Sequence, residues 1–163
     1  MVKIPVKNLS FRTILTVALA LIACGWSKCG TNTPPEYKKL FYLPLEQQET
    51  RFKQFPLDKQ VEIYTYAMYV EPPLTRYAGY LGDNGKKVLP LLLARLEAEE
   101  SDTAKAHLIY AFQEIHERHY SLRTETETVN SISRVISKMK DEYRKNQCEE
   151  YFRVIKEEPG FNG

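Results

Sequence analysis

Two apolar helical patterns joined by a very short polar stretch constrain the fold of this 163-residue chain most strongly. Residues 86–99 are rich in leucine at helical spacing, and residues 101–119 repeat the pattern with Leu108, Phe112 and Ile115. Only residues 98–102 separate the two patterns, and Ser101 or Asp102 is expected to cap the second helix. The short connection predicts that the two helices pack as antiparallel neighbours.

Further helices are predicted on both sides of this pair. The expected ranges are 45–55, 57–70 with Asp58 as its cap, one or two turns over 75–81, 124–145 and 147–158. Within residues 124–145 a single apolar seam is expected, formed by Val129, Ile132, Ile136, Met139 and Tyr143. Residues 37–42 form a short mixed segment that ends at Pro44, and the chain has no convincing strand pattern. The sequence therefore predicts an all-α fold, a compact array of antiparallel helices.

Residues 85–119 also resemble a HEAT-type helical hairpin. The resemblance rests on the run from Gly85 to Leu96, on Asp102, and on the run from Ala104 to Phe112. The arginine usual near the start of the second helix is missing, and Lys105 is the closest residue to it. The resemblance implies a HEAT-like array in which residues 57–81 form a degenerate preceding hairpin.

The start of the chain has the features of an export signal. Lys3, Lys7 and Arg12 precede an apolar stretch over residues 14–22. This stretch is shorter than the roughly 20 apolar residues of a transmembrane helix. An ordinary cleaved signal peptide and a membrane-spanning anchor are the two plain interpretations.

The end of this stretch, Leu21-Ile22-Ala23-Cys24, resembles the lipobox of bacterial lipoproteins. The resemblance implies cleavage before Cys24, acylation of its thiol, and attachment to the membrane of the bacterial cell envelope. Gly25 stands where an aspartate would retain a Gram-negative lipoprotein at the inner membrane, which implies the outer membrane facing the periplasm. The chain would then comprise a signal peptide at 1–23, a lipidated tether at 24–37, a helical domain at 38–158 and a tail at 159–163.

Two further cysteines remain if Cys24 carries lipid. An exported chain meets an oxidising compartment, so Cys29 and Cys148 are expected to form a disulfide or to stay as two unpaired thiols.

Weak candidates for a metal site are His116 and His119, which share a helix face because they are three residues apart. The zincin motif needs a spacing of four residues with a glutamate after the first histidine, so a solvated helix end is the favoured interpretation. No cofactor and no catalytic residue are predicted, because motifs for a nucleophile or a phosphate-binding loop are missing.

Tyrosine is unusually frequent, with eleven residues. Tyr66, Tyr69, Tyr77 and Tyr80, together with Arg76, form a candidate partner-binding surface, because tyrosine combines rigid contact area with a polar tip. The alternative is a core whose rings reach the surface.

The favoured hypothesis is a lipid-anchored, non-enzymatic binding or scaffold module with a protein partner in the envelope. Loss of Lys3, Lys7 and Arg12 with the signal reduces the 23 basic residues to 20, against 21 acidic ones, and this balance argues against nucleic acid as a partner. One special case is an immunity lipoprotein that neutralises a toxin. The alternative from another class is a small periplasm-facing metal-dependent enzyme that uses the region of His107, His116 and His119.

Overall fold

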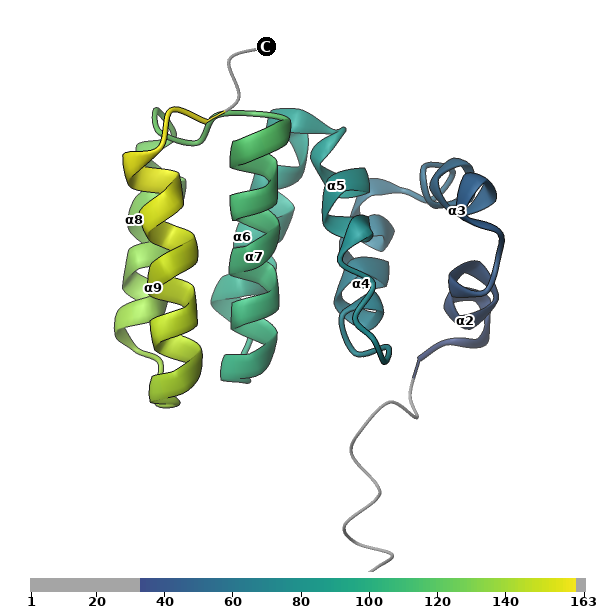
Figure 1. Cartoon of the computed structure of the whole chain (residues 1–163), viewed down its shortest axis with the longest axis horizontal. Coiled ribbons are helices and arrows are strands. Elements are labelled where there is room, and N and C mark those ends of the chain that lie inside the picture. The colour runs from purple at the N-terminus through teal and green to yellow at the C-terminus, as the bar shows by residue number, and fades with distance from the viewer. Residues whose placement is uncertain (1–32, 161–163) are drawn as a thin grey trace, which may run out of the picture. The chain divides into compact units, whose positions relative to one another are not determined.

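A computed structural model describes residues 33–160, and every regular element in that range is helical (Figure 1). The elements are α2 (Pro35–Phe41), α3 (Leu45–Phe52), α4 (Leu57–Ala67), α5 (Arg76–Gly82), the 3₁₀ helix η1 (Gly85–Val88), α6 (Leu89–Ala98), α7 (Asp102–Arg118), α8 (Thr126–Ser137) and α9 (Glu142–Glu157). The predicted all-α fold is confirmed. The segment that resembles a lipobox, with Cys24, and Cys29 lie outside the described residues.

Helices α4 to α9 are arranged in two layers. Helices α5, α7 and α9 contact one another in sequence order in one layer, and α4, α6 and α8 do so in the other (Figure 1). Helices α7 and α9 run in the same direction, because contacts join their starts and their ends. At the starts, the carboxylate of Asp102 accepts hydrogen bonds from the backbone N–H groups of Lys140 (2.7 Å) and Asp141 (2.9 Å). At the ends, the ring of His116 contacts the carbonyl oxygen of Glu158 (3.3 Å).

One continuous apolar core joins the helices. Its largest fully buried side chains include Tyr64, Tyr77, Phe52 and Phe112. Helices α2 and α3 add to this core at the α4 and α5 side of the layers, where Phe52 of α3 is completely buried. No helix within residues 33–160 is both long and apolar enough to cross a membrane.

The central hairpin has the predicted connection. Helix α6 ends at Ala98 and α7 starts at Asp102, and the hydroxyl of Ser101 accepts a hydrogen bond from the N–H of Ala104 (3.4 Å). This capping bond satisfies one of the free amides at the start of α7. The predicted cap at Ser101 is therefore confirmed.

One boundary and one capping residue near the start of the helical region differ from the prediction. Helix α2 begins at Pro35, and the side chain of Tyr37 is only 3% exposed, so residues 35–37 belong to the packed region instead of the tether. The predicted capping role of Asp58 is wrong. Pro56 occupies the cap position of α4, and no side chain makes a capping hydrogen bond there.

The single helix predicted over residues 124–145 is also wrong. Helix α8 ends at Ser137, and α9 starts at Glu142, where the carboxylate of Asp141 accepts a hydrogen bond from the N–H of Arg144 (3.1 Å). The expected seam therefore stops at Met139, and Tyr143 lies on α9 with 71% of its surface exposed. The break is stabilised by Asp102, which accepts from the backbone amides of Lys140 and Asp141, and by the Asp141 cap.

Candidate functional site

Most of the predicted tyrosine surface lies in or against the core. Tyr77 is fully buried, so it cannot contact a partner in this conformation, and its prediction as a binding residue is corrected. Its hydroxyl donates to the side-chain oxygen of Gln48 (3.1 Å), and its ring meets the edge of Phe52 at a centroid distance of 5.2 Å. Burial raises the pKa of Tyr77 above its ordinary value, so the hydroxyl stays protonated as a donor.

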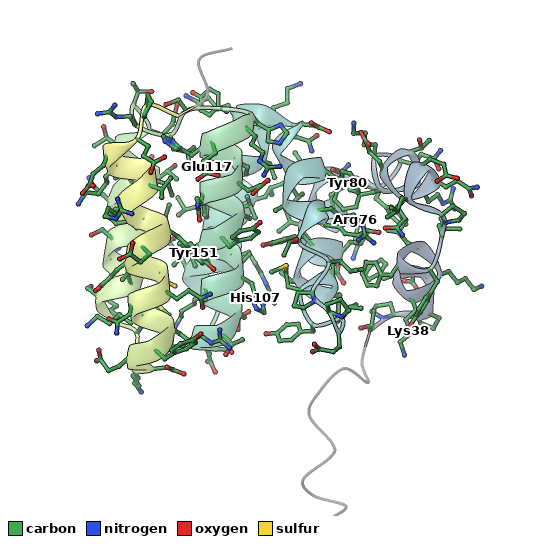
Figure 2. All side chains as sticks on the ribbon, viewed as in Figure 1. Lys38, Arg76, Tyr80, His107, Glu117 and Tyr151 are labelled. Carbon is green, nitrogen blue, oxygen red and sulfur yellow. The ribbon has the colours of Figure 1, made fainter. Side chains whose placement is uncertain are left out.

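Arg76 and Tyr80 have the same structural role on α5. The guanidinium of Arg76 donates twice to the oxygen of Gln48, from Nε (3.0 Å) and Nη2 (2.8 Å). The ring of Tyr80 is half-buried and packs on Phe52 (5.9 Å) and Tyr77 (5.3 Å). Figure 2 shows Arg76 and Tyr80 on the side of α5 that faces α3. These two side chains join α3 to α5.

Tyr66 and Tyr69 are placed differently, because both line a groove between α4 and α6. Tyr69 is 48% exposed, and the half-buried Tyr66 packs on Tyr37 at a centroid distance of 5.7 Å. We call this feature the α4–α6 groove, with a volume of about 660 Å³. Its lining residues are Asp58, Val61, Glu62, Thr65, Tyr66, Tyr69, Leu91, Ala94, Arg95, Ala98, Glu99 and Ala104.

The α6 side of the groove is lined mainly by apolar residues, two of which have small side chains. Leu91 is 36% exposed, and Ala94 and Ala98 follow it on the same side of the helix. Alanine side chains let another chain approach the helix backbone closely. Leu91 and Tyr69 together place two exposed apolar side chains in the lining of the groove.

Carboxylates predominate at the rim of the groove. Asp58, Glu62 and Glu99 face a single guanidinium, that of Arg95, which forms an ion pair with Glu99 (3.2 Å). Lys59 lies next to the groove and pairs with Glu62 (2.6 Å). The rim therefore keeps an excess of negative charge.

The three histidines occupy three separate environments. Both ring nitrogens of the buried His116 are engaged, with Nδ1 accepting from the N–H of Leu122 (3.1 Å) and Nε2 against Glu158 O. The ring of His119 packs on Gly82, and its Nδ1 lies 3.3 Å from a carboxylate oxygen of Asp83. Among residues 33–160 no cluster of three potential metal ligands occurs.

His107 lies nine residues before His116 on α7, which is about 13 Å along a helix. Its ring contacts Tyr69 edge-on at a centroid distance of 5.5 Å. The structure thus brings the predicted binding residue Tyr69 next to His107. His107 does not lie with His116 and His119 in a common cluster of metal ligands among the described residues.

Cys148 is completely buried in α9, and burial raises the pKa of its thiol to about 12. A disulfide with Cys29 stays a prediction, since Cys29 lies outside the described residues. Such a bridge would require Cys29 to reach into the core.

Sequence reasoning included the adjoining face of the hairpin at 86–119 in the possible binding surface, but it did not single out Leu91, Ala94 or Ala98. The signal was present, because Leu91 is additional to the buried Leu89, Leu92 and Leu96 of the same helix. A helix with one buried face does not need an apolar residue on the opposite side. No protein-family model, no curated protein and no solved structure matches the chain.

Proposed function

We propose that the protein is a lipid-anchored binding module of the bacterial cell envelope that holds a partner protein in the α4–α6 groove. The observation that carries the proposal is the pairing of two exposed apolar side chains, Tyr69 and Leu91, across a groove with small residues on one wall. The resemblance of residues 21–24 to a lipobox supplies the anchor and the location. The two-layer packing of α4 to α9 supports a HEAT-like array, an architecture that presents extended binding surfaces.

The chemistry of the groove indicates the kind of partner. An apolar centre within a polar rim is the usual anatomy of a protein interface. The excess of carboxylates at Asp58, Glu62 and Glu99 favours lysine or arginine on the other side. We therefore infer that the partner contributes a segment in which large apolar side chains stand beside basic ones, bound as a helix or an extended chain in the groove.

A photocrosslinking residue at position 91 of the full chain, in the cells that produce it, tests the proposal. The expected result is a single crosslinked protein, in which mass spectrometry maps the site to a segment with Leu, Ile or Phe beside Lys or Arg. The same crosslinker at Tyr143, an exposed tyrosine on α9, should not capture that protein.

Ala94→Arg separates specific docking from chance capture. The new side chain fills the groove and adds positive charge to an exposed helix position, so the crosslink from position 91 should fall at least tenfold. Ser133→Arg places the same charge on exposed α8 and should leave the yield unchanged. Equal yields from positions 91 and 143, or no effect of Ala94→Arg, would exclude the groove as the binding site.

A further inference from the structure

A second pocket lies between the connection from α4 to α5, helix α7 and helix α9. Its volume is about 340 Å³, within the range of small-molecule sites. Tyr110 and Tyr151 contribute rings to its lining and meet edge to face at a centroid distance of 5.6 Å. Figure 2 shows His107 on α7 and Tyr151 on the neighbouring α9. The pocket is separate from the α4–α6 groove and shares no lining residue with it.

The charge of this pocket comes from one side chain. Arg144 is half-buried, and no carboxylate lines the pocket with it. Within residues 33–160 its guanidinium forms no ion pair, although its Nη1 donates to the side-chain oxygen of Gln147 (3.0 Å). The guanidinium carbon also lies 5.3 Å from the ring centroid of Tyr143, a contact that leaves the positive charge in place. The pocket therefore has positive charge that the described side chains do not neutralise.

The ionisable groups nearest to Arg144 do not cancel its positive charge. Burial and, second, the positive charge of Arg144 lower the pKa of His107, so its ring is neutral at pH 7. The nearest glutamate on α7, Glu114, accepts from the hydroxyl of Tyr110 (3.2 Å) and is paired with Arg118 (2.9 Å). Its charge is thus paired with Arg118, and Glu114 itself does not line the pocket.

Hydrogen-bonding capacity also remains at the pocket. The hydroxyl of Tyr151 accepts from Nε2 of Gln147 (2.7 Å), which leaves its own proton free to donate. Nδ1 of His107 is buried and has no hydrogen-bond partner among the described residues, an arrangement that is rare in folded proteins. The pocket therefore combines the cation of Arg144, the hydroxyl donor of Tyr151 and the aromatic rings of Tyr110 and Tyr151. Its volume is large enough for one small ring.

We propose that this pocket binds a small organic molecule that carries a carboxylate on a planar ring. The carboxylate lies on the Arg144 guanidinium and accepts a hydrogen bond from the Tyr151 hydroxyl, and the ring lies against Tyr110 and Tyr151. Arginine matches a carboxylate with two parallel N–H donors, which gives orientation as well as affinity. This ligand site is distinct from the α4–α6 groove, although the ring of His107 in the pocket lining contacts Tyr69 of the groove.

Binding of 4-fluorobenzoate to the purified full chain, followed by ¹⁹F NMR, tests the proposal. The neutral analogue 4-fluorobenzamide has nearly the same shape and should bind at least tenfold more weakly. This comparison uses the unaltered protein, so it does not depend on the folding of any variant. Equal affinities, or no saturable binding of 4-fluorobenzoate, would overturn the proposal.

Substitutions then locate the site. Arg144→Gln should remove the preference for the carboxylate, and Arg144→Lys should keep part of it because the charge stays. Arg153→Gln removes a charge from an exposed position on the same helix and should have no effect. Tyr151→Phe should weaken binding several-fold through loss of the hydroxyl. If Arg153→Gln weakens binding as much as Arg144→Gln, the ligand does not lie on Arg144.

Discussion

Gln48 shows how a single residue decides the role of its neighbours. This glutamine is 3% exposed, and its oxygen accepts from Arg76 and Tyr77. Its Nε2 donates to the backbone carbonyls of Phe41 (3.2 Å) and Leu43 (2.7 Å). One amide thus ties the turn between α2 and α3 to α5, and draws two predicted surface residues into a structural network.

Gln48→Ala should therefore lower the free energy of unfolding by about 2–4 kcal/mol, because several buried polar groups lose their partner. The neighbouring Gln47 is exposed, and Gln47→Ala should change stability by less than about 0.5 kcal/mol. Urea denaturation of both variants provides the measurement. A loss of stability in Gln48→Ala as small as that expected for Gln47→Ala would show that the Gln48 network contributes nothing to stability.

His116 makes stability depend on pH. Its Nδ1 accepts the N–H of Leu122, so the ring proton is on Nε2, which donates to the carbonyl of Glu158. Burial, the largest cause, lowers the pKa of His116 below its ordinary value of about 6.5 in the unfolded chain. The contribution of neutral His116 to the free energy of unfolding is complete above the pKa of the unfolded chain. This contribution is lost as the pH falls toward the lower pKa of the folded state.

Unfolding free energy should fall between pH 7.5 and pH 5.5, and the fall should be smaller in His116→Gln, which cannot be protonated. Urea denaturation at the two pH values measures this difference. His107→Gln is compared in the same way, because burial also lowers the pKa of His107 and this residue can contribute to the pH dependence. An NMR titration that places the pKa of His116 above about 6.5 would contradict the argument.

At the scale of elements, one of the two glycines in α5 allows the close packing of His119, the residue that follows α7. A β-carbon at Gly82 would overlap the ring of His119, whereas one at Gly79 would lie 3.9 Å from His119 Nε2, an ordinary contact. Gly82 is buried, so a β-carbon there would require the ring of His119 to move.

Gly82→Ala should destabilise the protein by about 1–3 kcal/mol through overpacking. Gly79→Ala, in the interior of the same helix, should be neutral or stabilise by up to about 1 kcal/mol, since alanine favours the helix. Thermal denaturation checks both variants. In a double-mutant cycle, His119→Ala should reduce the cost of Gly82→Ala, and strict additivity would show that the ring is not the obstacle.

The break between α8 and α9 shows what sequence patterns miss at this scale. The apolar spacing continues from Ile136 through Met139 to Tyr143, and by itself it predicts one helix. The break is stabilised locally by the Asp141 cap of α9 and, across the fold, by Asp102 at the start of α7, which holds the amides of Lys140 and Asp141. These bonds and Lys105 lower the pKa of Asp102 to about 2, so the carboxylate is charged at neutral pH. A contact across 38 residues has no signature in local spacing.

For the whole molecule, the prediction concerns attachment. Wild-type cells fed a clickable fatty acid should label the protein, and Cys24→Ala should remove the label and leave the uncleaved precursor. Cys29→Ala is the matched control, because it removes a nearby thiol of the tether and should label normally. Labelling of Cys24→Ala equal to that of wild type would disprove lipidation at Cys24.

The sequence by itself determined the helical class, the central hairpin and the cap at Ser101, because periodicity and capping are local properties of the chain. It also identified Tyr66 and Tyr69 of the candidate groove. Only the tertiary structure decided that Tyr77 is in the core, that Leu91 faces Tyr69 across the groove, and that Arg144 lies without a carboxylate beside a pocket. The physical reason is that exposure and charge compensation depend on residues far apart in the chain, which only packing brings together.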